Sequence, residues 1–368
     1  MSTQVMTVRG PIEPEDLGFT SMHEHILSNV EVFRDRIQRL GLLPARVPLP
    51  AEDKLSLQNR STLRHAMILS TDNLSLDDEN VMTAEVADFK AAGGSTILEV
   101  SAPGIRTTPS DALALRRISE RTGVHIVAST GLYAEDTWPD RFRSMSLGGY
   151  TDFLRDEIAH GIGETGVLPG HIKVAYEGKS EPMDTYLRAA AHVSRESGLS
   201  MQVHVGLFRP NHEVRATVLR TLDDSECIPN RTLICHVENW LGSLPTTQLV
   251  MNPHSVPCDL TLHKEVLDRG FVLCFTCIGA EWDQEPLGLS HRPDWFILAG
   301  LRALLQEGYA DQLVLGHDVF TKLCTRRGGG EGFTRIPSFV IPTLRDCGVQ
   351  EGDLRKLTVE NPARLLAF

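Results

Sequence analysis

The sequence lacks the features of membrane, secreted and nucleic-acid-binding proteins. No stretch reaches the 18 or so consecutive apolar residues of a membrane-spanning helix, and Met1–Thr7 begin no apolar signal segment. Positive charge is not in excess, because 36 Lys and Arg stand against 48 Asp and Glu, for a formal net charge of −12. Attraction to phosphate needs clustered cations. We therefore expect a cytoplasmic protein with a small-molecule substrate and with no nucleic-acid or membrane partner.

Cysteine is scarce and odd in number. Seven cysteines in a chain without a secretion signal predict reduced thiols rather than a disulfide framework. Cys274 and Cys277 form one CxxC pair, and the sequence holds no second pair that would complete a structural zinc site. We expect both to pack as small buried apolar residues.

Biased tracts, linkers and short-period repeats are also absent, so nothing divides the 368 residues. Short β-rich runs alternate with helix-like stretches, which is the pattern of parallel βα units. The predicted strands are residues 18–22, 96–101, 125–129, 171–175, 201–205, 232–236, 271–275 and 312–316. The predicted helices are residues 80–92, 110–122, 150–160, 182–197 and 293–306. Eight strands with intervening helices predict one α/β domain over residues 1–368, a (β/α)8 TIM barrel.

Two connections are longer than a minimal barrel needs. Residues 30–79 follow the first strand and contain predicted helix, and residues 240–259 follow the sixth strand. Both belong to the face on which barrels carry their catalytic loops. They serve either the substrate or a subunit contact.

Two histidines close the first strand. His23 and His25 are separated by one residue, so along a strand their imidazoles point to the same side. They either bind one metal ion together or are hydrogen-bonded polar residues.

Further polar residues fall at the ends of other strands. Lys173, His204 and His236 follow one another at intervals of about one βα unit, and Asp318 follows the eighth strand. In a barrel these strand ends converge on one cavity. His317, next to Asp318, is turned away by strand alternation, and we expect it to be structural.

This set resembles the phosphotriesterase-like branch of the amidohydrolase superfamily nearly from end to end. The resemblance rests on residues 7–12 (TVRGPI), 18–20 (GFT), 23–25 (HEH), the single Lys173 and residues 360–364 (ENPAR). It implies a binuclear metal centre in which His23, His25 and Asp318 bind the more buried ion and His204 and His236 bind the more exposed one.

The same resemblance implies that Lys173 is an N6-carboxylysine that bridges the two ions. A protonated lysine has no lone pair, whereas the carbamate formed with carbon dioxide offers two anionic oxygens. The alternative is a lysine paired with an acid. The nitrogen and oxygen ligands fit two divalent ions, of which zinc is the first choice and manganese, cobalt and iron are the others.

The implied reaction is hydrolysis by a metal-bridging hydroxide, with Asp318 as the proton acceptor. Tyr133 matches a position where lactonases of this family carry a tyrosine. We therefore expect a hydrolase of lactones or activated carboxyl esters, with side activity on organophosphate triesters. The alternatives are an amide or N-acyl amino acid hydrolase on the same site and a non-catalytic ligand-binding homologue.

Other residues after the strands supply candidates for substrate binding. The aromatic candidates are Tyr133, Tyr176, Trp240 and Trp282, and Arg209 pairs with a substrate carboxylate unless it is a solvated surface residue. His236 is followed by Val237 to Trp240, where many relatives carry aspartates, so a proton relay out of the site is not implied. The resemblance also points to a homodimer through the loop after the first strand.

Overall fold

The computed structural model describes residues 3–39, 53–206, 211–242, 251, 258–280 and 293–368. The substrate-binding candidates Arg209 and Trp282 lie outside these residues. In the part described, no helix is both long and apolar enough to cross a membrane. The cytoplasmic location and the homodimer stay predictions.

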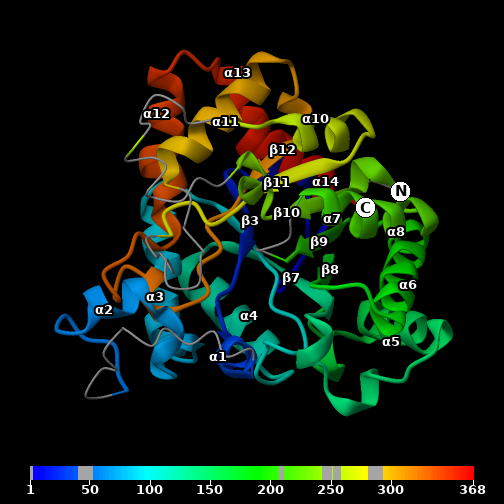
Figure 1. The fold of residues 1–368 in the computed structure, drawn as a ribbon. Coiled ribbons are helices and arrows are strands. Elements are labelled where there is room, and N and C mark those ends of the chain that lie inside the picture. Colours follow the sequence, from blue (N-terminus) through cyan, green and yellow to red (C-terminus); the bar gives the residue numbers. More distant parts are fainter. Residues whose placement is uncertain (1–2, 40–52, 207–210, 243–250, 252–257, 281–292) are drawn as a thin grey trace.

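Eight parallel strands form the centre of the molecule (Figure 1). Each strand pairs with the next along the chain, and all eight predicted strands are present. Their bounds are β3 (Thr20–Glu24), β6 (Thr96–Glu99), β7 (His125–Leu132), β8 (His171–Tyr176), β9 (Met201–Val205), β10 (Thr232–Cys235), β11 (Val272–Phe275) and β12 (Leu313–Leu315). This confirms the predicted (β/α)8 barrel.

The barrel closes where the last strand meets the first. The backbone N–H of Asp318, just beyond β12, donates to the carbonyl of His23 in β3 at 3.0 Å. Gly316 makes this approach possible, because a Cβ atom there would lie only 2.6 Å from Cβ of His23. The closure therefore joins two segments that carry site residues.

Helices surround the sheet (Figure 1). The main ones are α3 (Glu79–Ala91), α4 (Asp111–Thr122), α5 (Leu147–His160), α6 (Glu181–Ser197), α10 (Thr261–Asp268) and α11 (Asp294–Gln306). Shorter ones are α7 (Asn211–Val214), α8 (Arg220–Asp224), α12 (Ile341–Asp346), α13 (Glu351–Arg355) and α14 (Asn361–Leu366). All five predicted helices are confirmed to within a few residues.

Local chemistry sets where the helices begin and end. The Asp78 carboxylate accepts from two backbone N–H groups at the start of α3, and the Ser180 hydroxyl accepts from Met183 N–H at the start of α6. Gly123 and Gly198 end α4 and α6 in the left-handed conformation, which costs glycine little.

Side chains of the strands alternate between two apolar layers. On β10, Leu233 and Cys235 pack in one cluster, whereas Ile234 packs in the cluster that contains the helix residues Leu187 and Leu301. The second layer therefore lies between sheet and helices, and the first fills the barrel.

The extended connection after β3 is folded and tied to the barrel. It contains α1 (Glu31–Arg39), α2 (Arg60–His65) and the antiparallel strands β4 (Ser28–Asn29) and β5 (Ser75–Leu76). Lys322 Nζ lies 2.6 Å from the Asp72 carboxylate, which joins this connection to the segment after β12. The helix expected within residues 30–79 is confirmed, whereas most of the connection after β10 lies outside the described residues.

The chain ends lie side by side (Figure 1). Gln4 and Phe368 exchange two backbone hydrogen bonds, of 3.1 and 3.0 Å. An N-terminal hairpin of β1 (Val5–Thr7) and β2 (Gly10–Ile12) follows Gln4. These contacts lie away from the polar residues at the strand ends.

Candidate metal centre

Six polar side chains converge at the carboxyl ends of the barrel strands. They are the residues expected to bind metal: His23 and His25 from the end of β3, Lys173 from β8, His204 from β9, His236 just after β10 and Asp318 just after β12. None of the six is more than 5% exposed. Burying so many polar groups is costly unless they satisfy one another or a bound ion.

The first part of the cluster contains His23, His25 and Asp318. Oδ1 of Asp318 lies 3.4 Å from Nε2 of His25 and 3.5 Å from Nε2 of His23. The ligand atoms of these three residues all lie within 4.8 Å of one another, a spacing that suits a single cation.

The second part contains His204 and His236. Nδ1 of His204 and Nε2 of His236 face each other at 2.7 Å. A cation that moved between these two rings would be bound by two imidazole nitrogens.

The opposite nitrogens of three of these imidazoles are held by oxygen atoms. Nδ1 of His25 lies 2.9 Å from the Ser101 hydroxyl, and Nδ1 of His236 lies 2.7 Å from the Thr276 hydroxyl. Such partners fix the ring and leave the other nitrogen free to bind a metal. The donor set therefore fits a metal centre.

The third oxygen partner is a carboxylate. Oε1 of Glu177 lies 3.0 Å from Nε2 of His204. Burial alone would raise the pKa of Glu177, but the hydrogen bond and charge of His204, together with Arg36, lower it to about 2. Glu177 is therefore anionic beside the imidazole.

Lys173 is fully buried beside the histidines. Its Nζ lies 3.4 Å from Nε2 of His23, and within the described part of the chain no carboxylate lies within 4.0 Å of it. Burial lowers its pKa below that of an ordinary lysine. The alternative of a lysine paired with an acid finds no support in these contacts.

The protonation states suit metal binding. Burial is the largest cause that lowers the pKa of His23, and the charge of Lys173 adds to it; burial and the charge of His236 lower that of His204 to about 4. Burial would raise the pKa of Asp318, but the surrounding imidazoles lower it well below its usual value. Neutral imidazoles beside an ionised carboxylate are the forms that bind cations.

The backbone around the centre is unusual. His236, Cys277 and Asp318 each have a positive φ, of 63°, 53° and 57°, although none is glycine. Each lies just beyond a barrel strand. Such conformations cluster at functional sites because the surroundings must hold them in place.

Cys277 is a site residue that the sequence interpretation missed. Its thiol donates to Oδ2 of Asp318 at 3.4 Å, whereas Cys274 packs in the barrel interior as expected. Burial, with the nearby charge of Asp318, raises the pKa of Cys277 well above its usual value, so the thiol keeps its proton. The sequence did offer one sign of this role. Cys277 lies just after β11, and the residues just after other barrel strands belong to the site.

Glu238 was also missed as a supporting residue. Its carboxylate accepts from the backbone N–H of Thr276 at 3.0 Å and from the Thr276 hydroxyl at 2.9 Å, and so holds the hydroxyl that faces His236. The spacing of Glu238, two residues after His236, was a weak sign of this role.

His317 has the structural role expected of it. Its Nδ1 lies 2.6 Å from Oε1 of Glu24, and its Nε2 accepts from the backbone N–H of Ile336 at 3.0 Å. Glu24, between the two histidines of the HEH motif, therefore anchors the segment that carries Asp318.

The aromatic candidates fall into two groups. Tyr133 lies beside the centre, its ring 5.6 Å from that of His204, and its carbonyl accepts from the Trp138 indole at 2.6 Å. Burial raises the pKa of Tyr133 well above its usual value, with Glu177 adding to the effect, so the phenol is neutral.

Tyr176 and Trp240 do not match the expected substrate pocket. Tyr176 is the last residue of β8, fully buried in the layer under the helices, and its hydroxyl donates to Asp184 of α6 at 2.7 Å. Strand alternation turns it away from Lys173. Trp240 is 2% exposed and packs against His263, 5.4 Å between rings. Both are core residues here, which corrects the prediction.

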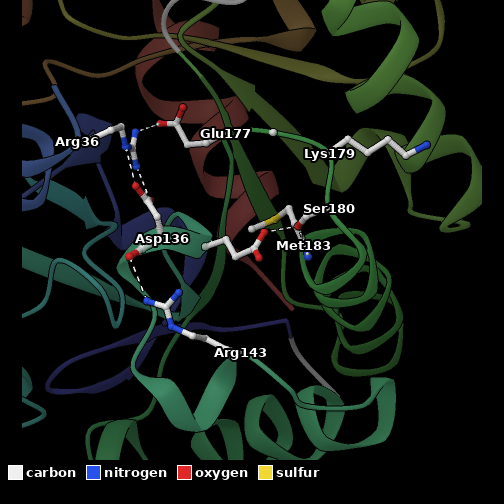
Figure 2. Close-up of a pocket in the computed structure, with 9 residues that line it drawn as sticks. Arg36, Asp136, Arg143, Glu177, Lys179, Ser180 and Met183 are labelled. Atoms are coloured by element: carbon white, nitrogen blue, oxygen red, sulfur yellow. Dashed lines mark hydrogen bonds and ion pairs between the residues drawn. The ribbon is translucent and has the colours of Figure 1, made fainter. Parts of the chain in front are cut away.

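A cavity of about 400 Å³ lies between the loops that carry Arg36, Asp136 and Glu177 (Figure 2). It shares Glu177, the partner of His204, with the centre. Six of the nine lining residues are charged, namely Arg36, Glu135, Asp136, Arg143, Glu177 and Lys179, and the other three are Gly178, Ser180 and Met183.

Comparison with known proteins agrees with this geometry. The chain matches the Phosphotriesterase family over residues 3–241 and 247–366. It is 27% identical over 383 residues to an N-acetyltaurine hydrolase of Salmo salar, covering 100% of this chain and 99% of that protein.

Solved structures give the same fold. A resiniferatoxin-binding protein from Rhodobacter sphaeroides superposes with a TM-score of 0.81 at 29% identity, covering 99% of this chain and 94% of that one. The lactonase Lmo2620 from Listeria monocytogenes superposes with a TM-score of 0.75 at 21% identity, covering 99% and 98%. Together with the cluster of histidines and Asp318, the family match identifies a metal-dependent hydrolase. The chain belongs to the phosphotriesterase family.

Proposed function

We propose that this protein is a binuclear metal-dependent hydrolase of small N-acyl amines, with lactones and activated carboxyl esters as a second substrate class. The observation that carries the hydrolase proposal is the convergence of six buried ligands whose outer nitrogens are largely tied to oxygen partners. We assign His23, His25 and Asp318 to one ion, His204 and His236 to the other, and Lys173, as a carboxylated side chain, to both. Zinc is the metal that this nitrogen and oxygen set suits first.

Two divalent ions bound there would supply an acidified water and polarise the acyl oxygen of the substrate. The chain's own groups handle the protons. Asp318 is held anionic among imidazoles, with Cys277 donating to its Oδ2, so it is placed to accept a proton and to pass it to the leaving group. Tyr133 keeps its proton beside His204 and can donate a hydrogen bond to the substrate.

The preference for amides rests on the relatives. Proteins named N-acetyltaurine hydrolase in fish and in human match this chain along its whole length, at 27% and 28% identity. An amide nitrogen leaves only when it is protonated, a task that Asp318 could perform. This reverses the order expected from the sequence, in which lactones came first.

Tyr133 supports lactones as the second class. It lies beside His204, at the position where the resemblance to lactonases predicted a substrate-contacting tyrosine. A lactone needs less help from an acid than an amide, because an alkoxide is a better leaving group than an amide anion. The organophosphate side activity expected from the sequence belongs to the same test.

The test is a substrate panel on protein that has been stripped of metal and reloaded with zinc. N-acetyl derivatives of taurine and of amino acids, lactones of several ring sizes, an aryl ester and a phosphotriester are compared by kcat/KM. We expect the highest kcat/KM for an N-acyl amine, abolished by chelation and restored by metal. If kcat/KM is highest for a lactone, lactones are the main substrate class and N-acyl amines the second. Reloaded protein that turns over none of the compounds would contradict the proposal.

A further inference from the structure

A line of charged side chains, Glu177, Arg36 and Asp136, joins three loops of the barrel (Figure 2). Glu177 lies just after β8, and its Oε1 is 3.0 Å from Nε2 of His204 and 3.4 Å from Nη1 of Arg36. Arg36, on α1, makes a two-point contact with the Asp136 carboxylate, at 2.8 Å from Nε and 2.6 Å from Nη2. The line therefore joins the connections that follow β3, β7 and β8.

The contact with Glu177 determines what His204 presents to the centre. A carboxylate can only accept, so the proton of His204 lies on Nε2 and the lone pair on Nδ1. Nδ1 is the atom that lies 2.7 Å from Nε2 of His236. Glu177 thus directs the lone pair of His204 toward the side of the ring that faces His236.

His204 differs here from the other histidines of the centre. Ser101 and Thr276 hold His25 and His236 through hydroxyl groups rather than carboxylates, and the Thr276 hydroxyl donates its own proton to Glu238. Of the four imidazoles of the centre, His204 is the one whose nitrogen on the side away from the other ligands lies within hydrogen-bond distance of a carboxylate. A carboxylate partner both fixes the tautomer and makes the other nitrogen a stronger ligand.

Arg36 in turn holds the carboxylate. Glu177 is partly exposed, with 27% of its side chain accessible, so burial alone does not fix its position. The two-point pair with Asp136 orients the guanidinium plane of Arg36, and its remaining Nη1 faces Glu177. The guanidinium also lies over the Phe33 ring, 5.3 Å from its centre.

We propose that Glu177, held by the Arg36–Asp136 pair, is a positioning residue that orients His204 and sets the affinity of the second metal ion. The inference rests on the proposed binuclear centre and goes beyond it, because it assigns control of one ion to the loops after β8 and β3. Since these residues also line the 400 Å³ cavity, whatever enters that cavity meets the side chains that tune the second ion.

The experiment measures metal binding rather than activity. Metal-stripped protein is titrated with zinc in a bicarbonate buffer, and the two dissociation constants are obtained by competition with a chromogenic chelator. In Glu177→Ala we expect the second constant to rise about 10- to 100-fold and the first to change little. Glu177→Gln should lose less, because its amide oxygen can still accept from His204 Nε2. The second zinc dissociation constant of Arg36→Met should lie between those of wild type and Glu177→Ala.

Arg143→Met is the matched control. Arg143 lines the same cavity, and its Nη2 donates to the backbone carbonyl of Asp136 at 3.2 Å, outside the contact with Glu177. Its two zinc constants should equal those of wild type. Thermal unfolding of the metal-free variants should also match wild type, which separates positioning from a loss of folding.

The outcomes separate this inference from the proposed function. If wild type binds two ions and Glu177→Ala binds both with unchanged constants, the inference is wrong and the hydrolase proposal stands. If Glu177→Ala weakens both ions equally, Glu177 acts on the fold rather than on His204, and the inference is also wrong. If wild type binds no zinc, both fail.

Discussion

The two halves of the candidate centre are held by different parts of the molecule. His23, His25 and Asp318 lie where the barrel closes, and the Asp318 N–H bonded to the His23 carbonyl makes the backbone itself the support. His204 and His236 depend on side chains from loops, namely Glu177 and Thr276. We expect the half supported by the barrel backbone to bind its ion more tightly. In the half supported by loops, changes of loop side chains can adjust metal affinity and substrate choice.

The largest effect is expected at Asp318, which belongs to the first half and is also the proposed proton acceptor. Asp318→Asn keeps an oxygen ligand but removes the charge that accepts a proton, so kcat for the best substrate should fall by about 100- to 10,000-fold. Zinc content is measured alongside. A variant that keeps its zinc and its kcat would remove Asp318 from the chemistry.

Closure of the barrel is tested by Gly316→Ala. The added Cβ would meet Cβ of His23 at 2.6 Å and its backbone N and O at 2.9 Å, so the β3–β12 contact must open. We expect the free energy of unfolding in urea to be about 1–3 kcal/mol lower than in wild type, and the affinity of the His23, His25 and Asp318 site for zinc to fall. Gly352→Ala, at a helical glycine with open space around it, is the control and should not destabilise. Equal stability of the two variants would contradict the closure argument.

Acid should lower the free energy of unfolding through His263, which lies under the loop-supported half of the centre. His263 packs beneath the segment after His236, with Nε2 2.8 Å from the Val237 carbonyl, and burial is the main cause that lowers its pKa to about 4. The pKa of His263 is about 6.5 in the unfolded chain and about 4 in the folded protein. At a pH between these two values the imidazole is protonated in the unfolded chain and neutral in the folded protein. The contribution of neutral His263 to stability is therefore complete above pH 6.5 and is lost as the pH falls toward 4.

The measurement compares wild type with His263→Gln, which removes this titration. The free energy of unfolding of wild type should drop by about 2 kcal/mol more than that of the variant between pH 8 and pH 5. His160→Gln, at an exposed histidine of α5, serves as the control. Parallel pH profiles for wild type and His263→Gln would show that His263 contributes nothing to acid sensitivity.

The smallest effect is expected at Cys277. Its thiol is a weak donor to Asp318, 3.4 Å away, so Cys277→Ala should lower kcat by only about 2- to 5-fold with both zinc ions kept. A loss as large as that of Asp318→Asn would instead make the thiol part of the catalytic machinery.

The barrel and the meeting of the six polar residues at one end of it could be predicted from the sequence because both depend on short-range patterns. Alternation along strands turns Lys173 and His204 inward, and spacing by one βα unit brings them to the same end of the barrel. Tyr176 was misplaced because β8 extends one residue beyond the predicted strand, which turns its ring outward. The side chain of Cys277 could not be placed, since a positive φ after β11 redirects the chain.

The supporting contacts were not predictable for a different reason. Arg36 and Glu177 meet only because the connection after β3 folds back over the strand ends, and no local pattern relates residues so far apart in the chain. The sequence therefore indicates which atoms can bind a metal, whereas the folded loops decide how those atoms are held.

The proposed function depends on two metal ions that share a carboxylated Lys173. The most direct test is metal analysis, together with native mass measurement in bicarbonate, of wild type and of Lys173→Ala. We expect about two metal ions per wild-type chain and a carbon dioxide adduct that disappears in the variant, together with most of the metal. Folded wild-type protein that stays free of metal and adduct after incubation with zinc and bicarbonate would contradict the proposed function.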